Sequence, residues 1–178
     1  MFSKSSLVLR IRSAAVDDAP AIAAIQVAAS RAAYAPIVPA DYFEDLTVPT
    51  RAAVWTQLIA GANETERIIV AEESEHVRGY AHFGQSRDLD AAEATGELYS
   101  LYVSPAKWRR GVGRQLLAAS FSGLSDQGFS TATLWVLTAN SQARRFYERC
   151  GWNDDGTTKG ASNSSAEIRY RSQLCIQY

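Results

Sequence analysis

Two glycines separated by one residue, Gly111 and Gly113, stand where a strand-like segment gives way to a helical pattern. Glycine lets the backbone approach a ligand closely, and the free N–H groups of a first helical turn attract negative charge. Four cations lie within the same eight residues: Lys107, Arg109, Arg110 and Arg114. The pattern predicts a phosphate-binding loop. A plain helix start beside solvated arginines would have the same sequence.

Two common nucleotide-binding loops are excluded by the residues that follow these glycines. A Walker loop continues with Gly-Lys-Ser/Thr, whereas Gly113 is followed by Arg114 and Gln115. A Rossmann fingerprint requires a third small residue where this chain has Leu116. The loop is therefore expected to hold another kind of phosphate.

The elements that must position this loop form one mixed α/β domain, expected over residues 7–177. Alternating and β-rich segments predict strands at 7–13, 67–73, 77–84, 97–103, 131–137 and 167–176. Apolar residues at helical spacing predict helices at 21–34, 41–46, 50–60, 111–127 and 140–150. The stretch 153–165 is rich in Gly, Ser, Thr and Asn, which indicates a loop or a loosely held hairpin.

Composition narrows the class of protein further. The chain has 178 residues, 47% of them hydrophobic, and a net charge of −1, so neither nucleic acid nor a membrane surface is an expected partner. No apolar run reaches the roughly 20 residues that span a bilayer. Cys150, Cys175, His76 and His82 make neither a disulfide framework nor a metal site, which favours a reduced, cytoplasmic setting.

Two segments, each running from a strand through a loop into a helix, carry a family resemblance. The first passes from the strand exit Val103-Ser104-Pro105 to Gly111-Val112-Gly113, and the second is LWVLTANSQARRFYERCGW. In order and spacing over residues 97–152 they resemble the two signatures of the GNAT superfamily of N-acetyltransferases. The segments IRSAAVDDAPAIAAI and EIRYRSQL resemble the family's ends less specifically. Trp108 departs from the family's Gln or Arg at that position, which leaves the phosphate contacts open.

The resemblance implies a GNAT fold, in which a central, mostly antiparallel, splayed sheet is flanked by about four helices. It also implies acetyl-CoA as co-substrate and no metal. The pantetheine arm would pair with the backbone of Leu101, Tyr102 and Val103. Asn140 would hydrogen-bond the arm or cap the next helix, or do both. The pyrophosphate would lie on the segment formed by Arg109, Arg110, Gly111, Val112, Gly113 and Arg114.

The resemblance also implies catalytic residues. Tyr147 falls on the tyrosine that protonates the departing thiolate, although a core tyrosine would fit the same helix. Glu97 falls on the general base of some members, or is an exposed acid at a strand start. The period of two places Glu97, Tyr99, Leu101 and Val103 on one face of the strand. Trp135 occupies another family position for a glutamate, so no base is expected there.

The acceptor is an amine of unsettled identity. Aromatic and basic residues that the resemblance places beside the acceptor are Tyr34, Tyr42, Trp55 and His82, and His82 is an alternative base. Cys150 is expected to be a small buried residue and not a nucleophile. A small-molecule amine, a protein N-terminus or lysine, and a non-catalytic acyl-CoA sensor all remain open, as does assembly into a homodimer.

Overall fold

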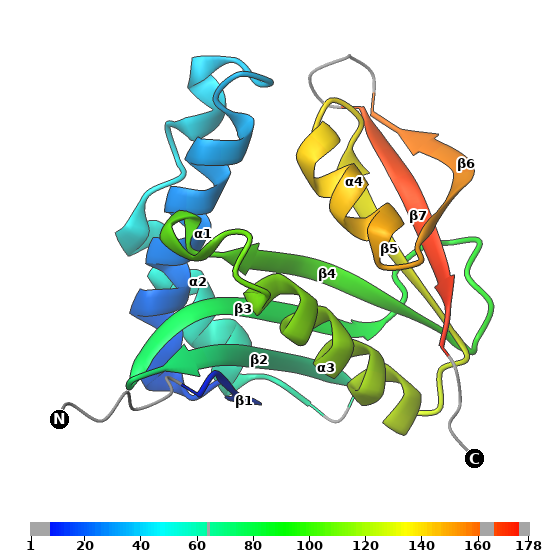
Figure 1. The fold of residues 1–178 in the computed structure, drawn as a ribbon, viewed down its shortest axis with the longest axis horizontal. Coiled ribbons are helices and arrows are strands. Elements are labelled where there is room, and N and C mark those ends of the chain that lie inside the picture. Colours follow the sequence, from blue (N-terminus) through cyan, green and yellow to red (C-terminus); the bar gives the residue numbers. More distant parts are fainter. Residues whose placement is uncertain (1–7, 64, 161–165, 175–178) are drawn as a thin grey trace, which may run out of the picture.

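The structure, a computed structural model, describes residues 8–63, 65–160 and 166–174. Residue 7 of the expected first strand and residues 175–176 of the expected last strand, Cys175 among them, lie outside the described residues. The described residues form the expected mixed α/β fold, with helices packed against a single open sheet (Figure 1).

The sheet has seven strands within the described residues, in the spatial order β1-β2-β3-β4-β5-β7-β6. Their bounds are β1 Arg10–Ser13, β2 Glu66–Glu73, β3 His76–Gln85, β4 Thr95–Val103, β5 Thr131–Leu137, β6 Asn153–Lys159 and β7 Glu167–Gln173. Neighbouring strands run antiparallel, except for β4 and β5, which are parallel.

The parallel pairing is short. It joins Thr95–Glu97 of β4 to Thr131–Thr133 of β5, and beyond Glu97 the two strands diverge (Figure 1). The edge of β4 from Leu98 to Val103 therefore lacks a neighbouring strand on the β5 side, as does the end of β5. This confirms the splayed, mostly antiparallel sheet.

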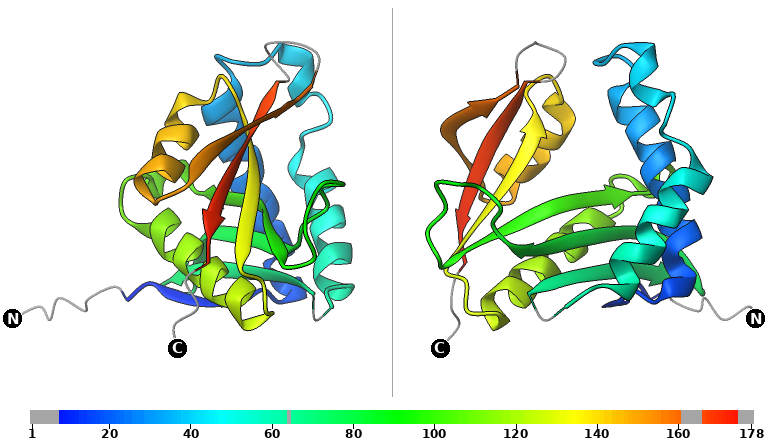
Figure 2. Two further views of the ribbon diagram at one scale, coloured as in Figure 1. Left: turned by 90° about the vertical axis from the view of Figure 1, so that its right-hand side faces the viewer. Right: turned by 180° about the vertical axis from the view of Figure 1, so that it is seen from behind.

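Helices cover both faces of the sheet. They are α1 Ala19–Tyr34, α2 Val48–Ala60, α3 Val112–Asp126 and α4 Ser141–Arg149, with the 3₁₀ turns η1 Val16–Asp18, η2 Ala40–Phe43 and η3 Pro105–Lys107. α1 and α2 pack on one face around Trp55, Val70 and Tyr80. α3 and α4 lie on the other face (Figure 2), around Leu116 and Tyr147.

β4 contains a β-bulge at Tyr99. His82 of β3 pairs with Ser100, whereas the next residue, Phe83, pairs with Leu98, so Tyr99 is the extra residue on its strand. An extra residue reverses the alternation of side chains beyond it. The ring of Tyr99 contacts the His82 ring edge to face, with centroids 4.8 Å apart.

The bulge overturns the expectation that Glu97, Tyr99, Leu101 and Val103 share a face. Leu98, Leu101 and Val103 pack into the core under α3. Glu97 precedes Leu98 and so faces the side of α1 and α2, together with Tyr102. A strict period of two assigned Glu97 to the wrong face of β4, because it does not allow for the one extra residue of the bulge.

The other differences from the sequence-based boundaries are local. The stretch 153–165, expected as a loop or loose hairpin, begins with the strand β6, which pairs with β7. The short helix expected at 41–46 is the 3₁₀ turn η2, and β1 begins at Arg10. In the part of the chain that the structure describes, no helix is both long and apolar enough to cross a membrane.

A buried arginine ties the loop between β3 and β4 to the second half of the sheet. Arg169 of β7 is 4% exposed and donates to Asp90 at 2.7 and 2.8 Å, to Asp155 at 2.7 Å and to Asp88 at 3.2 Å. Asp88 also accepts from Trp135 Nε1 at 2.8 Å. Such a network compensates the cost of burying the charge and fixes β5 and β7 relative to the loop.

The close contact between α3 and β3 yields a stability prediction for Gly123→Ala. A Cβ at Gly123 would lie 2.7 Å from two ring atoms of the buried Phe83. Overpacking costs about 1–3 kcal/mol, against at most about 1 kcal/mol gained in helix propensity. Urea titration should show a net loss of unfolding free energy, whereas the exposed Ser122→Ala on the same helix stays within about 0.5 kcal/mol. A stabilised Gly123→Ala would contradict this packing.

Candidate active site

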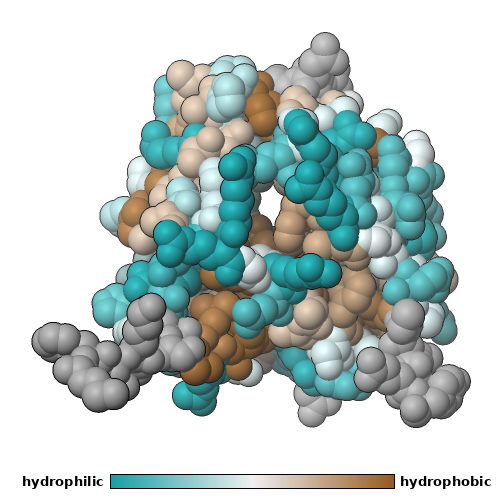
Figure 3. Space-filling view, viewed as in Figure 1, coloured by the Kyte–Doolittle hydropathy of each residue, from teal (hydrophilic) through white to brown (hydrophobic). Residues whose placement is uncertain are grey.

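A cleft of 1810 Å³ opens where β4 and β5 diverge. One wall comes from α1, η2 and β4, and the other from β5, α4 and the start of β7. Figure 3 shows the molecule hollowed between these two arms. Pockets for small ligands usually measure about 300–1,000 Å³, so this cleft has room for a large ligand and a second molecule.

The edge of β4 presents backbone groups to the cleft. The Ser104 N–H donates to the Arg78 carbonyl at 2.8 Å, and Val103 lies opposite Gly79. In an antiparallel ladder this pattern turns the backbone groups of Val103 away from β3, and those of Leu101 likewise. Tyr102 turns its backbone to β3, and its side chain lines the cleft.

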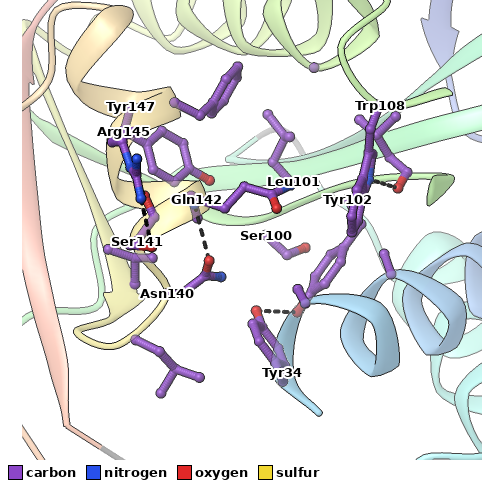
Figure 4. A pocket seen from close by; sticks show the side chains of 18 of the residues that line it. Tyr34, Ser100, Leu101, Tyr102, Trp108, Asn140, Ser141, Gln142, Arg145 and Tyr147 are labelled. Carbon is purple, nitrogen blue, oxygen red and sulfur yellow. Dashed lines mark hydrogen bonds between the residues drawn. The ribbon is translucent and has the colours of Figure 1, made fainter. Parts of the chain in front are cut away.

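Trp108 closes the end of this edge. Its indole Nε1–H donates to the carbonyl of Val103 at 2.8 Å, and its ring packs on the core under α3. The residue that departs from the family pattern thus supplies a side-chain donor that ties the loop to the last residue of β4. Figure 4 shows it on the cleft wall beside Tyr102.

The glycine loop adopts the conformation that its residues allow. Gly111 precedes α3 with φ 83°, and Arg109 has φ 60°, both in the left-handed region. Gly113 lies in the first turn of α3, where a Cβ would lie 3.4 Å from the ring of Phe146. Free N–H groups at the start of a 15-residue helix therefore adjoin the cleft.

The cations expected at this loop separate in the structure. Arg109 and Arg114 line the cleft together with Gly111 and Gly113. Lys107 also lines it but is paired with Glu73. Arg110, which is exposed, and Val112, whose side chain is buried, are not among the described residues that line the cleft.

Sequence reasoning missed two arginines of α4, Arg145 and Arg149, which line the same cleft. They are four residues apart and so share one face of the helix. Arg145 donates to the carbonyl and hydroxyl of Ser141 at 3.2 and 3.1 Å. Their spacing was visible in the sequence, but only the fold places them opposite a loop more than 30 residues away.

Tyr147 of α4 borders the cleft with its hydroxyl (Figure 4). Its ring is 9% exposed and packs against Phe146 and Trp152, with centroids 5.2 and 6.0 Å away. Burial, and to a lesser degree the nearby Tyr102, raises the pKa of the Tyr147 phenol. The group therefore stays protonated at neutral pH and can act only as a proton donor.

Asn140 caps α4 and lines the cleft as well. Its side-chain oxygen accepts from the Ala143 N–H at 3.1 Å, so the capping role is present. Its amide remains at the wall of the cleft, next to Ser141 and Gln142 (Figure 4). Cys150 also lines the cleft, and burial raises the pKa of its thiol, which disfavours a nucleophilic thiolate.

A pair of tyrosine hydroxyls faces Tyr147 from the opposite wall. The hydroxyls of Tyr34 and Tyr102 lie 3.3 Å apart (Figure 4). The ring of Tyr42 contacts that of Tyr34 edge to face, with centroids 6.2 Å apart. Burial raises the pKa of Tyr34 far above its ordinary value. These rings form the wall of the cleft on the side of α1.

Trp55 and His82, expected beside the acceptor, lie behind this wall. Trp55 is 2% exposed in the core under α1 and α2, and its Nε1–H donates to Gln26 at 2.8 Å. His82 lies 2.5 Å from Glu66, and burial lowers its pKa despite that carboxylate. Neither Trp55 nor His82 is among the described residues that line the cleft.

Glu97 is also set back from the cleft wall that the structure describes. Its side chain is 4% exposed, and its two oxygens accept from the backbone N–H and the guanidinium of Arg87, both at 2.9 Å. It faces the side of β4 that carries Tyr102, which is the side opposite α3. A carboxylate held in this way can reach the cleft only through water.

Comparison with known proteins agrees with this architecture. The family model described as Acetyltransferase (GNAT) family matches residues 31–152. An uncharacterised N-acetyltransferase of Bacillus subtilis is 31% identical over 131 residues, which cover 73% of this chain and 72% of that protein. An L-methionine sulfoximine/L-methionine sulfone acetyltransferase of Salmonella typhimurium is 32% identical over 85 residues, about half of each chain (48% and 49%).

The fold is shared with solved structures. The crystal structure of the PaiA N-acetyltransferase of Thermoplasma acidophilum in complex with coenzyme A has a TM-score of 0.74 and 16% identity, and the match covers 93% of this chain and 99% of that one. The family model spans the cleft from the end of α1 through the glycine loop to the end of α4. With its splayed sheet, its glycine loop and this match, the chain belongs to the GNAT acetyltransferase family.

Proposed function

We propose that this protein is an acetyl-CoA-dependent N-acetyltransferase that acetylates a primary amine of a small molecule. The observation that carries the proposal is the open edge of β4, which leads from the glycine loop to the hydroxyl of Tyr147 along a single cleft. Family membership supports the transfer reaction, and the relative in Salmonella typhimurium acts on a small molecule.

The coenzyme lies along the side of α3 and α4. Its pantetheine arm pairs with the open backbone groups of Leu101 and the N–H of Val103, as an added strand would, because the Val103 carbonyl already accepts from Trp108. The pyrophosphate rests on the backbone from Arg109 to Arg114, including Arg110 and Val112, and the Arg145 and Arg149 side chains add charge. The Asn140 amide contacts the arm.

The acceptor approaches from the side of Tyr34 and Tyr102. Its nitrogen attacks the thioester carbon, and backbone N–H groups of β4 stabilise the negative oxygen that forms. As the C–S bond breaks, its electron pair stays on sulfur, and Tyr147 gives the thiolate its proton. The amine proton passes through water to Glu97, which faces the acceptor side of β4, and the product is an amide.

Enclosure of the acceptor favours a small molecule over a protein chain. Tyr42 of η2 and Glu167 at the start of β7 both line the cleft, so the acceptor side lies between the two arms. A polypeptide substrate would need an open groove there.

Binding at the glycine loop is tested with Gly113→Val. The Cβ itself makes ordinary contacts with Phe146 and Val103, but the two further methyl groups of valine take space at the wall of the cleft, where the backbone must meet phosphate. Titration calorimetry should show the Kd of acetyl-CoA rising by about tenfold or more, equivalent to about 1.4 kcal/mol. Gly123→Ala is the reciprocal control, with lower stability and unchanged Kd. Tighter binding of ATP or NAD than of acetyl-CoA would refute the assignment.

Tyr147→Phe removes the proposed acid while keeping the ring. Turnover with the best amine should fall by about 10²-fold, the usual contribution of general acid catalysis, with little change in acetyl-CoA affinity. Tyr170→Phe is the matched control, because its buried hydroxyl bonds Glu148 and Arg144 away from the cleft. Unchanged turnover in Tyr147→Phe would remove it from the mechanism. Acetyl-CoA binding without turnover of any amine would favour a sensor.

The base is identified by the pH profile of Glu97→Gln. The amide keeps an acceptor for Arg87 but cannot take a proton, so kcat/KM should fall about tenfold or more at pH 7 and recover partly at high pH, where more amine is already neutral. Glu66→Gln alters the partner of His82 and leaves Glu97 intact. If the pH-dependent loss follows Glu66→Gln instead, His82 and not Glu97 takes the proton.

A further inference from the structure

Charged side chains that line the cleft divide by element. The cations come from the loop before α3 and from the ends of α3 and α4 that meet it: Lys107, Arg109, Arg114, Arg145 and Arg149. The carboxylates come from η2, the residue after it and the start of β7: Asp41, Glu44 and Glu167. In the left view of Figure 2, α4 and the start of α3 lie on one side of the sheet, and η2 lies on the other.

Glu167 faces the same side as η2. Its neighbour Ile168 packs into the core with Tyr147, so the preceding side chain points to the opposite face of β7. The cleft therefore has a basic coenzyme half and an acidic acceptor half. Among the described residues, the charged side chains that line the acceptor half are these carboxylates.

The walls of the acceptor half are aromatic, formed by the rings of Tyr34, Tyr42, Tyr99, Tyr102 and Trp135. The faces of aromatic rings attract cations. Two of these rings already contact cations of the protein itself. The Lys159 ammonium lies 4.0 Å from the centroid of Trp135, and the Arg87 guanidinium lies 3.9 Å from the centroid of Tyr99. The aromatic walls thus favour positive charge independently of the carboxylates.

Three of the cations near this side have anionic or aromatic partners. Lys159 pairs with Glu167 at 3.3 Å, and Arg87 pairs with Glu97 at 2.9 Å. Arg31 donates to the Phe43 carbonyl and stacks on its ring. A fourth cation, Arg51, donates to the Gln26 side chain at 2.9 Å. Among the described residues, none of the four lines the cleft. A substrate carboxylate would therefore enter without a partner beside Asp41 and Glu44, which is costly.

We infer that the acceptor is a small amine that carries a second ammonium group and no carboxylate, as in the chemical class of aliphatic diamines. The inference rests on the proposed function and assigns its specificity to Asp41 and Glu44, because Glu167 is already paired with Lys159. The reacting nitrogen lies at the Tyr34–Tyr102 pair, and the distant ammonium lies among the carboxylates and aromatic rings. These residues set KM and leave the chemical step unchanged, because they touch the unreactive end.

Three amines of equal length test the charge at that end: 1,4-diaminobutane, n-butylamine and 4-aminobutyrate. With wild-type protein and acetyl-CoA, thiol release should give a kcat/KM for the diamine at least tenfold above that for butylamine, with 4-aminobutyrate lowest. The diamine's KM should also rise with ionic strength, because salt screens the attraction. Equal or better use of 4-aminobutyrate overturns the inference and leaves the transferase proposal standing. No turnover of any of the three also overturns the inference, whereas the transferase proposal fails only if no primary amine is turned over.

Substitutions test which carboxylates cause the preference for the diamine. Asp41→Asn combined with Glu44→Gln should raise the KM for the diamine about tenfold, with kcat and the kinetics of butylamine within twofold. Glu167→Gln, which removes a carboxylate already paired with Lys159, should raise this KM less. Glu93→Gln, an exposed carboxylate outside the cleft wall, should leave all three amines unchanged. An equal loss for diamine and butylamine would show that the carboxylates serve the fold and not the second charge.

Discussion

The short parallel pairing between β4 and β5 is the constraint on which the site depends. Three residue pairs hold the two halves of the sheet together, and past Glu97 the strands separate. Separation leaves the backbone groups of Leu101 and the N–H of Val103 without a partner from a neighbouring strand, whereas the Val103 carbonyl accepts from Trp108. Unpaired backbone groups next to a cleft require a ligand or water. The same divergence opens the cleft whose walls α1 and α4 supply. The open edge of β4 and the cleft beside it therefore have one structural cause.

Holding such a sheet open requires anchors on both sides of the split. Arg169 of β7 binds Asp88 and Asp90 of the loop before β4, and Asp155 of β6. It lies opposite Trp135, just beyond Thr133, the last residue of β5 that pairs with β4. At the far end, Trp108 bonds the Val103 carbonyl and keeps the glycine loop against the strand. The bulge at Tyr99 lies between them and turns Glu97 and Tyr102 to the acceptor side while Leu101 and Val103 stay in the core.

Features that depend on neighbouring residues could be predicted from the sequence. Contacts between residues that are far apart in the chain could not. The positive φ of Gly111, the cap at Asn140 and the placement of Tyr147 on a helix follow from neighbouring residues, and the strand and helix order followed from periodicity. The face of β4 on which Glu97 lies was predicted wrongly, because the one extra residue of the bulge reverses the alternation of side chains along the strand. Arg145, Arg149 and the Tyr34–Tyr102 pair were missed because their partners are distant in sequence. Trp55, equally aromatic, turned out to be core because its neighbours bury it.

The division of the cleft by charge also bears on how protons move. Burial raises the pKa of Tyr34 and Tyr147, so these phenols are protonated at neutral pH and cannot take a proton from an amine. In the proposed reaction, the carboxylates that line the acceptor side of the cleft bind the second charge of the amine. Glu97 lies behind the wall and is paired with Arg87, so the amine proton has to reach it through water. We propose that separating the group that binds the substrate's charge from the group that takes its proton lets one small pocket hold a dication and still deprotonate one end of it.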